Sequence, residues 1–350
     1  MRKIAKQSYS NWITYGIVIA AFVICQMMIS NGSMSRSMKG QLVPICCWVS
    51  MAVSLNLVVG ISGELSLGHA GFMSVGAFSG VVTSSWLLSA FGMENELLRM
   101  VLSMVVGGTF AGFAGVIIGI PVLRLRGDYL AIVTLAFGEI IRNVLNCVYI
   151  SVEGKDLHFG ILNPNLAGTL ILNGPNGASG IKKIATFNMG FVLVMRTLLV
   201  VLNLVNSRSG RAIKAIRDNR IAAEATGINT TKYRMMAFVT SAVLAGFAGA
   251  LYGLNFSSMV PGKFKFDQSI LVLVFVVLGG IGSIRGSVIA AAVLTVLPEV
   301  LRAFADYRML VYAVVLILMM LLTNNKKMIG MLSAFREKLQ KKEQNGGASV

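Results

Sequence analysis

Charged residues are scarce in this chain. Asp, Glu, Lys and Arg make up 13% of its 350 residues, whereas 55% are apolar and the mean hydropathy is +0.75. A soluble domain carries about 25% charged residues, so this chain has too little polar surface for a soluble enzyme. The same apolar content excludes a disordered chain. Because a membrane helix needs about 20 apolar residues, the length allows about ten spans and little else.

Cysteine and histidine, which often bind transition metals, are also few. The two histidines are His69 and His158, and the four cysteines are Cys25, Cys46, Cys47 and Cys147. All four cysteines lie in apolar runs and none forms a CxxC pair, which is typical of small buried residues rather than of a metal or redox site. We therefore expect no metal ion and no cofactor.

The signatures of catalysis are absent as well. ATP hydrolysis needs a glycine-rich phosphate loop that ends in Gly-Lys-Ser or Gly-Lys-Thr. The Gly-Lys pairs of this chain, at 154–155 and 262–263, are followed by Asp and Phe instead. No nucleophile elbow, HExxH pair or acidic dyad occurs either. We predict that the chain is not an enzyme and that any ATPase acting with it is a separate chain.

Acidic residues are rarer than basic ones, and 14 Asp and Glu against 31 Lys and Arg give a net charge of +17. Basic residues gather near the N-terminus, in 208–234 and in 326–342, where they flank apolar runs. This is the pattern of cytoplasmic loops under the positive-inside rule, close to anionic membrane lipid. A nucleic acid partner is not expected.

The apolar runs predict an all-α, polytopic integral membrane protein with about 8–10 transmembrane helices, some of them broken or re-entrant. Ten runs are candidates: 12–30, 42–61, 66–91, 100–120, 129–150, 187–206, 235–256, 270–281, 287–300 and 309–322. The run 12–30 resembles a signal peptide, but no small-residue cleavage site follows it, so we expect it to be an uncleaved first helix. If the N-terminus is inside and successive loops alternate between the two sides of the membrane, both termini lie in the cytoplasm. The expected organisation is a transmembrane domain over 1–325, an external loop at 151–186, a cytoplasmic loop at 207–234 and a basic cytoplasmic tail at 326–350.

Two regions predict broken helices. The run 66–91 opens with polar side chains, and the short runs 270–281 and 287–300 are separated by a glycine-rich stretch. Broken helices are tolerated in a membrane where they face protein or a water-filled cavity, and in transporters they mark the substrate path. A buried acid and base three residues apart on one helix face are further candidates. The candidate translocation path consists of Ser66, His69, Glu139, Arg142, Gly279 and Gly280.

Each of these candidates also has a structural interpretation. His69 is favoured as a hydrogen-bonded packing residue rather than a substrate contact. Glu139 and Arg142 are slightly favoured as an ion pair that neutralises itself between helices. The glycines around Gly280 either break a helix or allow close packing.

Two glycine-rich strings resemble each other, FAGFAG at 110–115 and LAGFAG at 244–249. In the predicted topology the first runs inward and the second outward, which is compatible with an inverted repeat. The alternative is that helices packed through Gly and Ala converge on such strings.

The loop 207–234 contains an alanine-rich stretch, 210–228, with interleaved cations. Alanine favours a short helix, and Gly227 supplies a suitable helix end. Such a helix can dock in a groove of a partner protein, or lie on anionic lipid beside the membrane. The residues alone favour neither interpretation.

The string GRAIKAIRDN at 210–219, followed by AAEATGI at 222–228, resembles the coupling loop of the permeases of branched-chain amino acid ABC importers. Further signatures of that family follow in order: NLVVG at 56–60, LSLGHAGF at 65–72, LRLRGDYLAIVTL through GEIIR at 123–142, GPNG at 174–177, VLGGIGS at 277–283 and LPE at 297–299. Together they cover about residues 50–310 and resemble the larger-loop permease of the usual pair. The chain departs from the family at Ile221, where the coupling loop usually has Glu.

The resemblance implies a permease subunit of the inner membrane that works with ABC ATPase subunits, a second permease subunit in a heterodimer and an external substrate-binding protein. It implies branched-chain amino acids as substrates, although close relatives carry urea or short amides. The implied ATPase-coupling residues are Arg217, Asp218, Ala222, Ala223, Glu224 and Gly227. The alternative is a secondary transporter driven by an ion gradient, which would account for an inverted repeat and a buried Glu139 but not for the long basic loop.

Overall fold

The computed structural model describes residues 2–32, 34–125, 127–162 and 166–301, and beyond these only 310, 311, 313, 314 and 317; side chains are described from residue 12 onward. The chain forms two compact units, Met1–Val293 and Leu294–Val350, and the sites described below lie within the first. The predicted boundary at 325 and the tail 326–350 lie outside the described residues.

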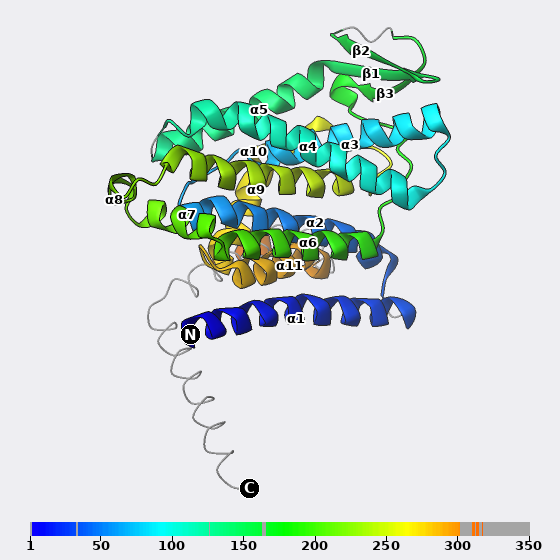
Figure 1. Ribbon diagram of the computed structural model, residues 1–350. Coiled ribbons are helices and arrows are strands. Elements are labelled where there is room, and N and C mark those ends of the chain that lie inside the picture. Colours follow the sequence, from blue (N-terminus) through cyan, green and yellow to red (C-terminus); the bar gives the residue numbers. More distant parts are fainter. Residues whose placement is uncertain are drawn as a thin grey trace. The chain divides into compact units, whose positions relative to one another are not determined.

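Seven helices of the described part are long and apolar enough to cross a membrane. They are α1 (Arg2–Ser30), α2 (Arg36–Asn56) with its π-helical extension η1 (Leu57–Ser62), α3 (His69–Phe91), α4 (Glu96–Val122), α5 (Asp128–Cys147), α6 (Phe187–Asn206) and α9 (Thr230–Gly253). They run side by side (Figure 1) and coincide with seven of the predicted runs. The prediction of a helical multi-pass membrane protein is therefore confirmed.

The remaining predicted spans differ from this regular pattern. The run 270–281 forms the short helix α10 (Phe266–Gly279), and 287–300 falls in α11 (Ile284–Val300). Fourteen residues of α helix rise about 21 Å, less than the hydrocarbon core, so α10 does not cross the membrane by itself. Nearly all of the run 309–322 lies outside the described residues.

The helices α3, α4 and α9 pack tightly at the centre of the first unit. A Cβ atom built on Gly107 would lie 2.9 Å from the Cβ of Ala250, and one on Gly115 would lie 2.7 Å from the Cβ of Ala242. As the residue number rises along α4 it falls along α9, so the two helices are antiparallel. The strings 110–115 and 244–249 therefore run in opposite directions, as predicted, and they pack against each other; the inverted repeat itself stays a prediction.

The expectation of an all-α chain misses one small sheet. Strand β1 (Val148–Glu153) lies between β2 (Asp156–Ile161) and β3 (Thr169–Asn173), and both pairings are antiparallel. β1 has β-branched residues at every second position, Val148, Ile150 and Val152, and the turn at Gly154, with a φ of 60°, returns the chain as β2. This local signal was available in the sequence, but the predicted loop 151–186 was treated as a single connection.

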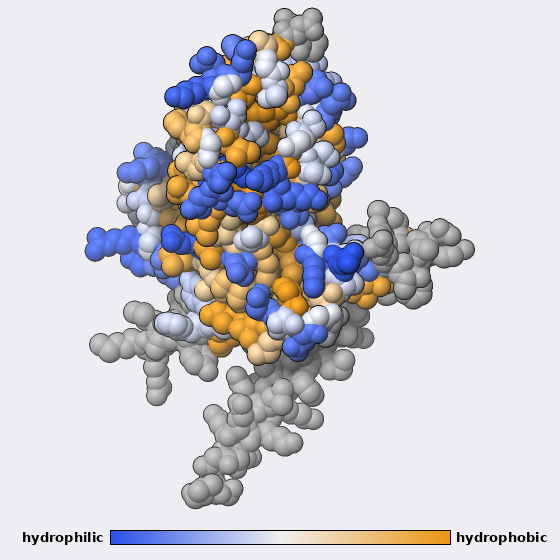
Figure 2. All heavy atoms as spheres, turned by 90° about the vertical axis from the view of Figure 1, so that its right-hand side faces the viewer, coloured by the Kyte–Doolittle hydropathy of each residue, from blue (hydrophilic) through white to orange (hydrophobic). Residues whose placement is uncertain are grey.

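The first unit has two distinct ends. The beginning of α1, α7 (Arg208–Asp218) and α8 (Arg220–Ala225) lie at the left in Figure 1, and the sheet lies at the right with the connection from α3 to α4. Hydrophilic side chains cover much of the right-hand end, with apolar patches between them (Figure 2). Arg285 Nε, near the start of α11, donates a hydrogen bond of 2.8 Å to Thr14 Oγ1 of α1.

Candidate functional site

The segment that leads into α3 has no regular structure and is partly buried: Glu64, Ser66 and Gly68 are buried, whereas Gly63 and Leu65 are exposed. It begins at Gly63, whose φ of 77° ends η1, and α3 begins only at His69. The amide of Leu67 donates to Thr134 Oγ1 of α5 at 3.0 Å, and that of Ala70 donates to Ser269 Oγ of α10 at 3.1 Å. The predicted break at the start of the run 66–91 is confirmed, and side chains of neighbouring helices take the place of the missing helical hydrogen bonds.

Ser66 and His69 lie within this break, and both are 2% exposed. His69 Nε2 is 2.8 Å from Ser54 Oγ of α2, and its ring meets Phe72 edge to face. Ser66 Oγ is buried and forms no hydrogen bond among the described residues. These contacts favour the packing interpretation of His69; a place on the substrate path stays a prediction for both residues.

Glu139 and Arg142 meet as their spacing predicts, with Arg142 Nη2 2.7 Å from Glu139 Oε2. The structure adds a third partner, because the amide of Phe266 donates to Glu139 Oε1 at 3.2 Å. Phe266 is the first residue of α10, whose first amides have no partner within the helix. The ion pair therefore anchors the start of α10 against α5.

The glycines Gly279 and Gly280 lie at the opposite end of α10, away from this ion pair. The helix ends at Gly279, and Gly280 follows with a φ of 92°. Gly280 therefore ends the helix. A Cβ atom on Gly279 would collide with the backbone of Gly286, so Gly279 and Gly286 allow the chain to double back in close contact. The amide of Gly282 donates to Asn56 Oδ1 of α2 at 2.9 Å. The helix break and the close packing proposed as alternatives occur together.

A cavity of about 270 Å³ lies at the start of α10, and the sequence analysis did not identify it. Its lining consists of Trp48, Tyr252, Gly262, Lys263, Phe264, Lys265, Asp267 and Gln268. These residues come from α2, α9, α10 and the short helix η3 (Pro261–Phe264). The signal in the sequence is the charged stretch 263–267 between two apolar runs, a pattern that by itself predicts only a connection.

The predicted coupling helix is divided in two. Asn219, with φ −156° and ψ 106°, interrupts it, and its side chain accepts a hydrogen bond of 3.0 Å from the amide of Ala222 at the start of α8. Gly227 ends α8 as predicted: its φ is 82°, and the amides of Gly227 and Ile228 donate to Glu224 and Ala223. This pairing is the usual glycine C-cap.

The side chains of α8 point in two directions. Ala223 is only 5% exposed and packs within the chain, whereas Ile221 is 81% exposed and Ala222 is also exposed. Ala223 is thus buried within this chain rather than on the exposed face of α8, and the assignment of Ala222 and Ala223 to a partner contact stays a prediction. Arg217 also contacts its own chain, because Nη1 donates to the carbonyl of Gly60 at 2.6 Å, and Asp218 is exposed.

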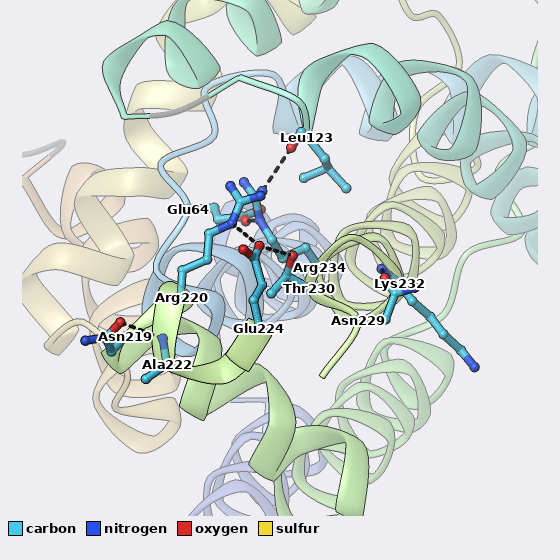
Figure 3. A network of polar contacts seen from close by, with 10 residues as sticks. All are labelled: Glu64, Leu123, Asn219, Arg220, Ala222, Glu224, Asn229, Thr230, Lys232 and Arg234. Atoms are coloured by element: carbon cyan, nitrogen blue, oxygen red, sulfur yellow. Dashed lines mark hydrogen bonds and ion pairs between the residues drawn. The ribbon is translucent and has the colours of Figure 1, made fainter. Parts of the chain in front are cut away.

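Glu224 connects α8 to α9. Its Oε1 is 2.8 Å from Arg220 Nε and accepts a hydrogen bond of 2.9 Å from Thr230 Oγ1, the first residue of α9 (Figure 3). One turn further along α9, Arg234 forms an ion pair with Glu64 and donates to the carbonyl of Leu123 at 2.9 Å. Both charged side chains are 8% exposed. The coupling segment and the broken entry to α3 thus contact adjacent turns at the start of α9.

A bundle of membrane-spanning helices that contains broken segments, with a basic helical segment at one end, defines the chain as a membrane permease. The family model described as "Branched-chain amino acid transport system / permease component" matches residues 40–323. The chain belongs to this family of ABC importer permeases. Because this is a family of transport subunits, the prediction that the chain is a permease and not an enzyme is confirmed.

Individual relatives agree with this assignment. The chain is 33% identical over 330 residues to the high-affinity branched-chain amino acid transport system permease protein LivM of Salmonella typhimurium, covering 84% of this chain and 69% of that protein. It is 34% identical over 299 residues to LivM of Escherichia coli K12, covering 75% and 63%, respectively. BraD of Pseudomonas aeruginosa, the permease of another high-affinity branched-chain amino acid transport system, is 27% identical over 254 residues. The matches span about two thirds of the length of the two LivM proteins, and no solved structure matches the chain.

Proposed function

We propose that this chain imports branched-chain amino acids as one of two permease subunits in an ATP-driven importer, with ATP hydrolysed by separate subunits. The names of the LivM and BraD relatives support the substrate class. The absence of a Gly-Lys-Ser/Thr phosphate loop in the sequence supports the separation of transport from hydrolysis.

The observation that carries the proposal is the outward face of α8. Ile221 exposes 81% of its surface beside the small side chain of Ala222, in a segment that is otherwise basic and polar. An exposed apolar residue on a helix that is held from behind is suited to a groove of a partner protein. Ala222 permits close approach, so we assign this face to an ATPase subunit. Lipid binding by the same face is the alternative outcome.

The contacts behind α8 provide a path for coupling. A displacement of α8 pulls on Thr230 through Glu224, and so on the start of α9. Arg234 then carries the displacement to Glu64, in the segment that enters α3. Buried charge pairs of this kind do not stretch gradually, because separation leaves an uncompensated charge. The ATPase contact is thereby connected to the broken helix.

This assignment sets the orientation in the membrane. ATPase subunits are cytoplasmic, so the end that holds α7, α8 and the start of α1 faces the cytoplasm, in agreement with the positive-inside rule. We assign both termini to the cytoplasm because basic residues gather at both ends of the sequence. The sheet β1–β3 faces outward, where an external binding protein delivers substrate. A second permease subunit completes the translocation path as a heterodimer.

The test is reconstitution of the importer, with its second permease, ATPases and binding protein, in vesicles. We expect uptake of labelled leucine to require ATP and not an ion gradient, and urea not to compete. Uptake driven by a proton or sodium gradient without ATP would support a secondary transporter instead.

Docking is tested with Ala222→Trp, which should abolish co-purification of the ATPases while membrane insertion is kept. Ile161→Trp adds the same bulk to the sheet at the opposite end, where Ile161 is 75% exposed, and should retain the ATPases. If α8 lies on lipid, Ala222→Trp strengthens membrane attachment and leaves uptake intact.

A further inference from the structure

The cavity at the start of α10 has three aromatic walls. The rings of Trp48 and Tyr252 are 5.8 Å apart and those of Tyr252 and Phe264 are 6.2 Å apart, both arranged edge to face. Lys263 Nζ lies 4.7 Å above the ring of Phe256, so this lysine is held to one side by a cation–π contact. Such walls suit a branched aliphatic group, and the electron-rich ring faces also attract an ammonium group.

Two charges of opposite sign line the same cavity without meeting each other. Lys265 and Asp267 flank Phe266, and in the described part of the chain neither side chain forms a hydrogen bond or an ion pair. The neighbouring Gln268 side chain also forms none among these residues. An acid and a base that share a cavity but stay apart can each receive an opposite charge from a ligand.

Lys265 and Asp267 are exposed in this chain, although they lie at the depth of a membrane span. The amide of Phe266 bonds to Glu139, which stands near the middle of the 20-residue span α5. Charged side chains at such a depth are expensive unless they face water, a partner or a ligand. The anchoring of Phe266 by Glu139 also places Lys265 and Asp267 reproducibly, as a binding site requires.

We propose that this cavity binds the zwitterionic head of an α-amino acid, with Asp267 receiving the ammonium group and Lys265 the carboxylate. The aliphatic side chain lies against Trp48 and Phe264. The inference rests on the proposed function and assigns the substrate a site within it. A volume of about 270 Å³ suits a small solute, since pockets for drug-sized ligands measure about 300–1,000 Å³. The headgroup of phosphatidylethanolamine has the same pair of charges and is the competing source of this chemistry.

Equilibrium binding to the assembled permease pair with its ATPases, in phosphatidylglycerol nanodiscs, tests the proposal. The probes are leucine, 4-methylpentanoate, which lacks the amino group, and leucinamide, which lacks the carboxylate. The wild type should bind leucine at least about tenfold more tightly than either analogue, because a hydrogen bond to a charged group contributes about 1.5–3 kcal/mol.

The two charge variants should fail in different ways. Asp267→Asn should weaken leucine binding at least about tenfold and leave 4-methylpentanoate unchanged. Lys265→Gln should weaken leucine binding by the same factor and leave the affinity for leucinamide unchanged. Lys265→Arg should bind leucine as tightly as the wild type does. The retained analogue binding shows that each variant is folded. Asp156→Asn on the sheet and the exposed Lys182→Gln are matched controls and should bind leucine as the wild type does.

Two results overturn the assignment. One is normal leucine binding by both Asp267→Asn and Lys265→Gln; if ATP-driven leucine uptake persists, the proposed function stands and the site lies elsewhere. The other is phosphatidylethanolamine that binds the wild type, is lost in Asp267→Asn and is not displaced by leucine, which assigns the cavity to lipid. Failure of the proposed function is distinct from both, because the wild-type importer then shows no ATP-driven leucine uptake.

Discussion

Arg234 of α9 forms a buried ion pair with Glu64, which precedes it by 170 residues and belongs to the segment that enters α3. The same guanidinium donates to the carbonyl of Leu123, the residue that follows α4 (Figure 3). One side chain therefore joins α9, the end of α4 and the broken entry to α3. Four residues before Arg234 on α9, Thr230 donates a hydrogen bond to Glu224 of the coupling helix α8.

Removal of one member of this pair should be worse than removal of both. Glu64→Ala or Arg234→Ala leaves an uncompensated buried charge, which costs about 3–5 kcal/mol. Glu64→Leu combined with Arg234→Met removes both charges and should be stably inserted, as thermal unfolding of the detergent-purified importer can show. If the pair transmits coupling, the double variant hydrolyses ATP with less leucine uptake per ATP. An unchanged ratio would assign the pair a structural role only.

Replacement of Glu139 by Gln should reduce transport less than its replacement by Ala. Glu139→Ala leaves the charge of Arg142 and the amide of Phe266 both without a partner, whereas Glu139→Gln keeps an acceptor for Phe266. We expect Glu139→Ala to abolish leucine uptake and Glu139→Gln to retain a measurable part of it. The double change Glu139→Gln with Arg142→Leu should be at least as active as Glu139→Gln alone. Equal loss in Glu139→Gln and Glu139→Ala would mean that the negative charge itself, rather than the contact with Phe266, is required.

The glycine contact between α4 and α9 should not accept a side chain. A Cβ on Gly246 would collide with Ala111 and approach the Cα of Gly108 to 3.0 Å, so Gly246→Leu must push two buried helices apart. Overpacking of this kind costs about 1–3 kcal/mol or more and should reduce the yield of folded protein in size-exclusion chromatography. Gly16→Leu in α1 is the control, because no atom lies within 4 Å of its Cβ position. Equal yields of the two variants would contradict the packing described here.

The cap at Asn219 should influence ATPase binding without contacting the ATPase. Asn219→Ala removes the hydrogen bond to the amide of Ala222 at the start of α8 and costs about 1 kcal/mol. Because α8 must then be ordered on binding, the affinity for the ATPases should fall about fivefold. Asn219→Asp retains a capping oxygen and should bind as the wild type does. A full loss of binding in Asn219→Asp would indicate a direct contact instead.

Local patterns in the sequence were sufficient for several features. Apolar runs located seven spans, the (i, i+3) spacing predicted that Arg142 meets Glu139, and Gly227 marked the end of a helix. The family signatures identified the class of permease. These features depend on periodicity, on the low charge that a membrane demands and on the backbone freedom of glycine, all of which are local.

The small sheet was missed for another reason. The alternation in 148–153 and the tight turn at Gly154 are also local, but they follow a long membrane helix without a break. The apolar composition of α5 continues into this strand, and a short apolar run fits a helix as well as a strand.

What the sequence determined by itself is the class of the protein, the positions of seven spans and the helix breaks before His69 and after Gly279, because each of these follows from the properties of neighbouring residues. Only the tertiary structure decided that Arg234 pairs with Glu64 and Phe266 with Glu139, and that Lys265 and Asp267 line a cavity with aromatic walls. It also decided that Ala223 faces inward while Ala222 faces outward. These contacts join segments as much as 170 residues apart, or choose one face of a helix, and both depend on how helices pack against each other.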